Sequence, residues 1–227
     1  MAESKNTLEE QYKVYDDDKA LGKAAPSLAS LKLLHFPEGV EAVDEIRYAD
    51  KDATVVCFWG KLFKGSYPTI NLWSDLAASD KYASRVRFVG VSRDSSEKDA
   101  NKYISRIGNE MPELGENGII LSGGIPLAFD ADSEVNGAFK TLLQVKSLGV
   151  DNAFIVDSDG NIQWRTLFNR GKEPSGQFES QLLLVVAGKP VEKKNPPLVQ
   201  ESDDDEDDED AGADNAAGIR MMAMADY

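Results

Sequence analysis

The side chains best suited to covalent chemistry in this chain are its single thiol, Cys57, and its single imidazole, His35. One cysteine excludes an internal disulfide and a cysteine-rich metal site, and one histidine argues against a zinc site or a histidine-dependent triad. We expect His35 to pack beside a strand or to reach water. Cys57 is either a buried strand residue that behaves as a small apolar group, which we favour, or a reactive thiol.

Two acidic clusters, Asp157–Gly160 and Asp130–Glu134, have compositions that suggest calcium ligands. An EF-hand loop needs acidic ligands at two-residue steps before a glycine, and a glutamate six positions after it. In the first cluster Ile155 and Thr166 occupy the first and last of these places, and in the second Val135 replaces the glycine. We therefore predict turn and helix-cap residues in both clusters, with no metal and no cofactor.

The strong acidity of the chain belongs to its C-terminal segment. Of the formal net charge of −15, Gln200–Tyr227 carries −10 and residues 1–199 carry −5. Nine carboxylates in the ten positions of Glu201–Asp210 repel one another and cannot bury a core, so we predict a disordered acidic tail. Solubility is its default role. Weak cation binding, docking onto a basic protein surface and phosphorylation of Ser202 are the alternatives.

The charge and hydropathy of the chain also limit its partners. Neither part offers the basic face that nucleic-acid backbones require, so we expect no direct nucleic-acid binding. No apolar run approaches the roughly 20 residues that cross a bilayer, and we expect no membrane partner. The N-terminus is polar and acidic, without the basic start and apolar centre of a signal peptide. These features predict a cytoplasmic protein.

Hydrophobic periodicity predicts the elements that position Cys57. Ala53–Trp59 is a nearly continuous apolar run, typical of a central strand buried on both faces. A helix follows from Ser66, where apolar residues recur at helical spacing. Ser95 or Ser96 can cap the next helix. The remaining predicted elements are strands over 86–91, 125–130, 153–156 and 162–168, helices over 97–107, 134–145 and 176–187, and a hairpin turn over 157–161.

This alternation of strands and helices predicts an α/β domain in which a central mixed sheet is flanked by helices. The length of 227 residues suits one domain of ordinary size with tails. We predict an N-terminal extension over 1–19, the domain over 20–190 and the acidic tail over 191–227.

Four motifs of this domain are Gly22–Pro26, Val55–Trp59, Val89–Asp94 and Ala153–Ile162. They look like the Gly-x-x-Ala-Pro segment, the central strand, the Val-Gly-Val-Ser-x-Asp turn and the Phe-x-Ile-Asp-x-x-Gly-x-Ile hairpin of redoxins. In order and spacing the chain resembles the redoxin branch of the thioredoxin superfamily, which includes tryparedoxin-, nucleoredoxin- and peroxiredoxin-like proteins. The resemblance implies a thioredoxin-like fold.

The resemblance also implies where redox chemistry would lie, and the chain departs from the family there. Aligned on Phe58 and Trp59, Phe63 takes the nucleophile position and Ser66 the resolving position of the Cys-x-x-Cys motif. Phenylalanine has nothing to ionise, and a helix N-terminus does not appreciably acidify a serine hydroxyl. The degenerate active-site loop comprises Trp59, Leu62, Phe63, Lys64, Gly65, Ser66 and Tyr67.

Two further comparisons with the family concern thiol chemistry. Asp151 or Asn152 stands where redoxins often have a cis-proline that faces the thiol, and a carboxylate there would oppose thiolate formation. Peroxiredoxins carry Thr or Ser three residues before their reactive cysteine, and Thr54 has this spacing from Cys57. However, the proline of that pattern is absent, and Cys57 lies inside the predicted strand rather than after it.

We therefore expect a redoxin-fold protein that lacks dithiol chemistry and binds or assembles proteins through the degenerate loop and the acidic tail. In this superfamily the loop normally meets extended peptides. The side chains expected to supply contact area are Trp59, Leu62, Phe63, Tyr67 and Trp73. The alternative is a thiol oxidoreductase or peroxidase that uses Cys57. A third hypothesis is a low-affinity cation buffer that works through the tail.

Overall fold

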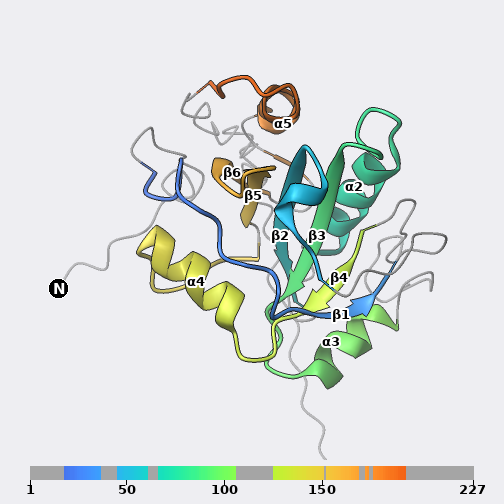
Figure 1. The fold of residues 1–227 in the computed structure, drawn as a ribbon. Coiled ribbons are helices and arrows are strands. Elements are labelled where there is room, and N and C mark those ends of the chain that lie inside the picture. The colour runs from blue at the N-terminus through green and yellow to red at the C-terminus, as the bar shows by residue number, and fades with distance from the viewer. Residues whose placement is uncertain are drawn as a thin grey trace, which may run out of the picture.

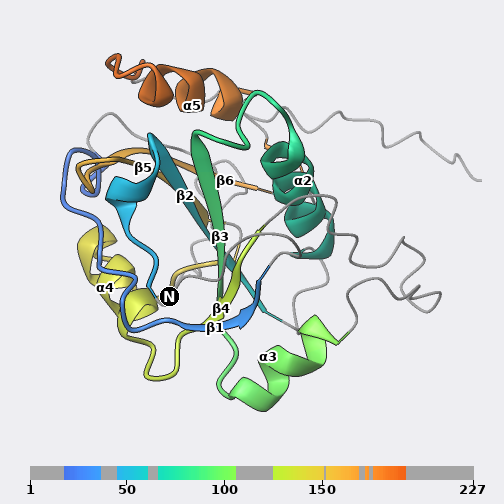
Figure 2. The ribbon, with the colours of Figure 1, turned by 45° about the vertical axis from the view of Figure 1, so that its right-hand side comes forward.

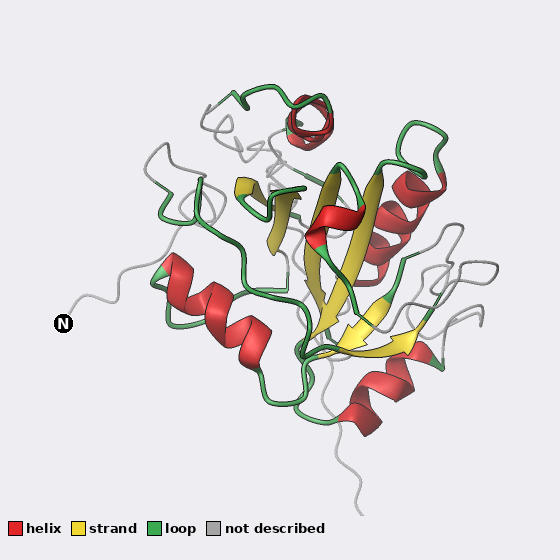
Figure 3. Cartoon of the chain, in the orientation of Figure 1, coloured by secondary structure: helices red, strands yellow, loops and turns green. Residues whose placement is uncertain are grey.

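The computed structural model describes residues 18–36, 45–60, 66–105, 125–150, 152–168, 172–173 and 176–192. Six strands in this part form one sheet in the order β1-β4-β3-β2-β5-β6 (Figures 1 and 3). The strands are β1 (Lys32–His35), β2 (Ala53–Trp59), β3 (Val86–Ser92), β4 (Leu127–Phe129), β5 (Asn152–Asp157) and β6 (Ile162–Leu167). The helices are the 3-10 helix η1 (Tyr48–Asp50) and the α-helices α2 (Ser66–Ala78), α3 (Glu97–Ile104), α4 (Glu134–Leu143) and α5 (Phe178–Val186).

Strand β2 lies at the centre of the sheet, as its apolar sequence predicts. It pairs in parallel with β3 and antiparallel with β5, so the sheet is mixed. In this register Cys57 lies opposite Gly90 on one side and Ala153 on the other. All seven residues of β2 are buried, because helices cover both faces of the sheet.

One face of the sheet packs against three helices, α2, α3 and α5, and we call it the three-helix face. From β2 it receives the alternate residues Ala53, Val55, Cys57 and Trp59. The helices contribute Ile70 and Trp73 from α2, Ala100 and Tyr103 from α3, and Phe178, Leu182, Val185 and Val186 from α5. This face contains all three tryptophans of the chain, and each is 1% exposed or less.

The opposite face, which we call the α4 face, packs against a single helix and an N-terminal segment. It receives Val56 and Phe58 from β2. Helix α4 adds Val135, Phe139 and Leu143, and the N-terminal segment adds Ala20, Leu28 and Leu31. Figure 2 shows α4 and this segment on one side of the sheet, with α2 on the other.

The structure corrects the predicted helix bounds at four ends, the fourth being the end of α5 at Val186 rather than 187, and the backbone explains two of them. Helix α4 stops at Leu143 rather than 145 because Gln144 adopts a left-handed conformation with φ of 57°. Helix α5 begins at Phe178, after Gly176, which has φ of 64°. Helix α3 stops at Ile104 rather than 107. Its N-terminus is capped by Ser96, whose Oγ accepts a hydrogen bond from the Asp99 amide at 3.2 Å.

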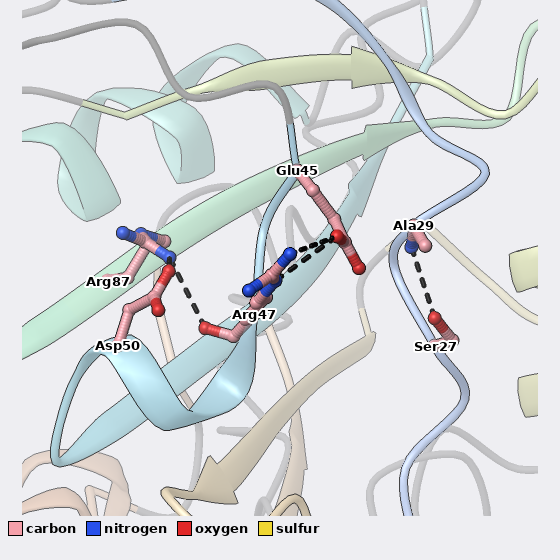
Figure 4. Close-up of polar contacts among 6 residues, drawn as sticks. All are labelled: Ser27, Ala29, Glu45, Arg47, Asp50 and Arg87. Atoms are coloured by element: carbon pink, nitrogen blue, oxygen red, sulfur yellow. Dashed lines mark hydrogen bonds and ion pairs between the residues drawn. The ribbon is translucent and has the colours of Figure 1, made fainter.

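The segment before β2 is held by polar contacts at the N-terminal ends of the two central strands (Figure 4). The Arg87 guanidinium on β3 donates to the Arg47 carbonyl at 3.3 Å and to the Asp50 carboxylate at 3.0 Å. Arg47 in turn pairs with Glu45 at 3.0 Å. These contacts fix η1 beside the N-terminal ends of β2 and β3. Among the described residues, no helix is long and apolar enough to cross a membrane.

Candidate functional site

The strand–loop–helix unit predicted for the degenerate loop is present in the fold. Strand β2 ends at Trp59 and helix α2 begins at Ser66, the position that aligns with the family's resolving cysteine. Leu62, Phe63, Lys64 and Gly65 lie outside the described residues, as do the side chains of Ser66 and Tyr67. The frame of the site is therefore confirmed, whereas the roles assigned to these side chains stay predictions.

Cys57 lies in the middle of the central strand and is sealed from solvent. Its side chain is 0% exposed, and its Sγ–H donates to the Val89 carbonyl at 3.0 Å. Burial raises the pKa of the Cys57 thiol well above its ordinary value, because the thiolate would lose its hydration inside the apolar core. This arrangement confirms the interpretation of Cys57 as a small apolar core residue.

The expectation that Trp59 and Trp73 offer aromatic contact area to a partner is wrong. Both side chains are 0% exposed and belong to the three-helix face. Trp59 lies against Tyr103 with ring centroids 4.4 Å apart, and Trp73 meets the edge of Phe168 at 5.4 Å. The alternation of side chains along β2 explains the position of Trp59: it lies two residues after Cys57 and therefore on the same face of the sheet.

Asn152, one of the two positions aligned with the family's cis-proline, is the first residue of β5 and is 5% exposed. Its Nδ2 donates to the Gly149 carbonyl at 3.2 Å, and its Oδ1 accepts from Arg165 at 3.1 Å. Arg165 also pairs with the 2%-exposed carboxylate of Asp18 at 2.5 Å. The Asn152 amide is therefore bound into the fold. Asp151 lies outside the described residues.

This Asp18–Arg165–Asn152 network was not predictable from the sequence. Its members are far apart along the chain, and a polar residue between buried neighbours is ordinary in a strand such as β6. Only the pairing of β5 with β6 places Arg165 beside Asn152, and only the path of the N-terminal segment brings Asp18 to it.

His35 and Cys57 are not brought together. His35 is half-buried on β1, and β4 and β3 lie between β1 and β2 in the sheet. Three strand spacings correspond to about 14 Å. Partial burial lowers the pKa of His35, because its charged form loses hydration. A Cys–His catalytic pair is therefore excluded by the topology.

The two acidic clusters have the structural roles that their sequences predict. Asp130 accepts hydrogen bonds from the Val135 and Asn136 amides at 3.3 and 2.8 Å and so caps the N-terminus of α4. Asp157 accepts from the Asn161 amide at 2.8 Å in the β5–β6 turn. No group of acidic, histidine or cysteine side chains among the described residues could hold a metal ion. The acidic tail and Ser202 lie outside these residues.

Comparisons with known proteins bear on the fold. No family model and no curated protein matches the chain. Among solved structures, an uncharacterized conserved protein from Geobacillus kaustophilus is similar with a TM-score of 0.51 and 20% identity, over 80% of this chain and 90% of that one.

Two other similar structures are a thioredoxin-like protein in the oxidized form and the reduced 2-Cys peroxiredoxin of Plasmodium vivax. The first has a TM-score of 0.43 at 18% identity, over 73% of this chain and 97% of that one. The second has a TM-score of 0.48 at 18% identity, over 74% of this chain and 95% of that one. At these identities the likeness concerns the fold alone. The chain has a thioredoxin-like fold with a mixed six-stranded sheet.

Proposed function

We propose that this protein is a redoxin-fold binding or assembly module without thiol catalysis, and that it engages extended segments of partner proteins through the loop between β2 and α2. A cytosolic location is part of the proposal, since free thiols stay reduced there. The observation that carries the proposal is the burial of Cys57, the only thiol of the chain.

Thiol chemistry requires a thiolate that a disulfide or peroxide can reach. Cys57 meets neither condition, since it is 0% exposed and burial keeps its thiol protonated. A second cysteine to resolve a mixed disulfide is absent from the sequence. The positions that align with the family's two thiols hold Phe63 and Ser66, neither of which forms a nucleophile at neutral pH.

The binding half of the proposal rests on the loop sequence and on the fold that frames it. With Trp59 and Trp73 in the core, the apolar contact area of the loop reduces to Leu62, Phe63 and Tyr67. Aromatic and apolar anchors of this kind dominate the energy of protein interfaces. The resemblance to redoxins supplies the partner class, an extended peptide, because that is what meets this loop in the superfamily.

The catalytic alternative is tested by the reactivity of Cys57. We expect Ellman's reagent to modify the native protein about 1,000-fold more slowly than the urea-unfolded protein, because reaction needs opening of the core. We also expect no peroxide consumption and no insulin reduction above the background rate, for wild type and for Cys57→Ser alike. Turnover that the Cys57→Ser substitution abolishes would overturn the proposal.

The binding role is tested with a phage-displayed library of random peptides selected on the full chain. Selected peptides should bind at least about 10-fold more weakly to Phe63→Asp, because the change removes the central aromatic anchor and introduces a charge. Leu183→Asp is the matched control, since it also replaces an apolar side chain by a carboxylate. Leu183 lies on α5 and is 38% exposed. Failure to enrich any peptide, or equal binding to all three proteins, would contradict a loop-binding role.

A further inference from the structure

The α4 face of the molecule carries a groove that the sequence did not predict. It lies between the N-terminal segment and α4, which run side by side in Figures 1 and 2, and it is an open groove of about 740 Å³. Its lining residues are Lys19, Lys23, Ala138, Thr141, Leu142 and Gln144. The groove lies on α4 and so is distinct from the loop between β2 and α2.

The lining of the groove combines an apolar floor with a cationic rim. Ala138 and Leu142 are four residues apart on α4 and therefore lie on one face of the helix. Ala138 is exposed. Lys19 and Lys23 are exposed, and the Lys19 ammonium donates to the Gln144 side chain. No carboxylate is among the lining residues, so the groove suits an apolar ligand that carries negative charge.

The sequence of this chain contains a segment with that combination. Glu201–Asp210 holds nine carboxylates, and Ile219–Tyr227 adds three of the five methionines of the chain. Methionine side chains adapt to irregular apolar surfaces. We propose that the groove binds this segment of the same chain, with carboxylates of Glu201–Asp210 at Lys19 and Lys23 and methionine side chains on Ala138 and Leu142.

The length of the connection allows this contact within one molecule. Asp210, the end of the acidic run, follows Glu192, the last described residue, by 18 residues, and Ile219 follows it by 27. These lengths reach about 60 Å and about 90 Å when extended, both more than the diameter of about 40 Å expected of a domain this size. A tether of this kind gives the segment an effective concentration in the millimolar range, so that a weak contact is populated. Contacts between exposed charges weaken with salt, and the bound fraction should fall as ionic strength rises.

This inference is independent of the proposed function, because it concerns a different surface and needs no outside partner. The test uses the full ¹⁵N-labelled chain with a nitroxide spin label on Asn215→Cys, between the acidic run and the methionines. The buried Cys57 stays unlabelled in the native protein. We expect broadening of the amide signals of residues 19–23 and 138–144, and loss of that broadening in Lys19→Glu/Lys23→Glu.

The matched control is Lys98→Glu/Lys102→Glu, which reverses two exposed lysines on α3 and changes the net charge equally. It should keep the broadening. Ala138→Glu leaves both lysines in place, puts a carboxylate on the groove floor and should also abolish the broadening. Amide spectra away from the groove verify that each variant is folded. The inference is overturned by an absence of localised broadening, by broadening that survives the Lys19/Lys23 change, or by broadening that appears only between labelled and unlabelled copies.

Discussion

The two faces of the sheet differ in how they are covered. Three helices seal the three-helix face, which buries all three tryptophans and the only thiol. The α4 face has one helix and an N-terminal segment, and a groove with a cationic rim remains between them. Thus Cys57 lies on the three-helix face, and the groove for which we propose binding of the acidic tail lies beside α4. The thioredoxin-like fold thus encloses its only thiol in the core on one face of the sheet and leaves a groove beside the helix on the other.

The largest effect should come from opening the three-helix face. Trp73→Ala removes a 0%-exposed indole that contacts Phe168, and we expect a loss of about 3–5 kcal/mol in the free energy of unfolding. The neighbouring Leu72 is only half-buried, so Leu72→Ala should lose about 1–2 kcal/mol. Urea denaturation measures both. Equal losses would mean that this face is less tightly packed than the structure shows.

The N-terminal segment on the α4 face should depend on one buried ion pair. Asp18→Asn leaves the Arg165 guanidinium, which is 16% exposed, without its charged partner. We expect the free energy of unfolding to fall by about 2–3 kcal/mol. The control Asp52→Asn breaks the ion pair between Asp52 and Arg85, two side chains that are each half-exposed. It should lower the free energy of unfolding by at most about 1 kcal/mol. If the two variants were equally stable, the pair would not hold this segment.

A glycine on each face compares their packing directly. A Cβ on Gly90 would lie 2.6 Å from Leu127 Cδ2 and 3.1 Å from Trp59, so Gly90→Ala should destabilise the protein by about 1–3 kcal/mol. Gly137, on α4, has open space around its Cβ position. Gly137→Ala should stabilise the protein by about 0.5–1 kcal/mol, because alanine favours the helix. The midpoint of thermal unfolding should fall for Gly90→Ala and rise for Gly137→Ala. Shifts in the same direction would contradict the difference in packing between the two faces.

The smallest effect concerns the start of α3, one of the helices of the closed face. Ser96→Ala removes the hydroxyl that accepts from the Asp99 amide and should lose about 1 kcal/mol. Ser95 is exposed and lies outside the helix, so Ser95→Ala should change stability by less than about 0.5 kcal/mol. Paired urea denaturation curves decide between the two serines, and the reverse ranking would reassign the cap.

Much of the fold was predictable because local signals and burial agree. The run Ala53–Trp59 reads as a strand with the bounds that the structure gives it, since every residue is apolar or β-branched and both faces are buried. Asp130 and Asp157 act as cap and turn residues because these roles depend on nearby backbone amides. The end of α4 was mispredicted because Gln144 adopts a left-handed conformation that its residue type does not indicate.

By itself, the sequence determined the order of strands and helices from β2 onward, the absence of a second cysteine and the apolar character of the strand that holds Cys57, whereas β1 and η1 were not predicted. These follow from periodicity and composition, which act along the chain. The tertiary structure alone decided which helices cover each side of β2, and hence that Cys57 and Trp59 share one core with α2, α3 and α5. It also joined Asp18 to Arg165 and set Lys19 and Lys23 beside α4, because such pairings depend on which segments pack together rather than on their sequences.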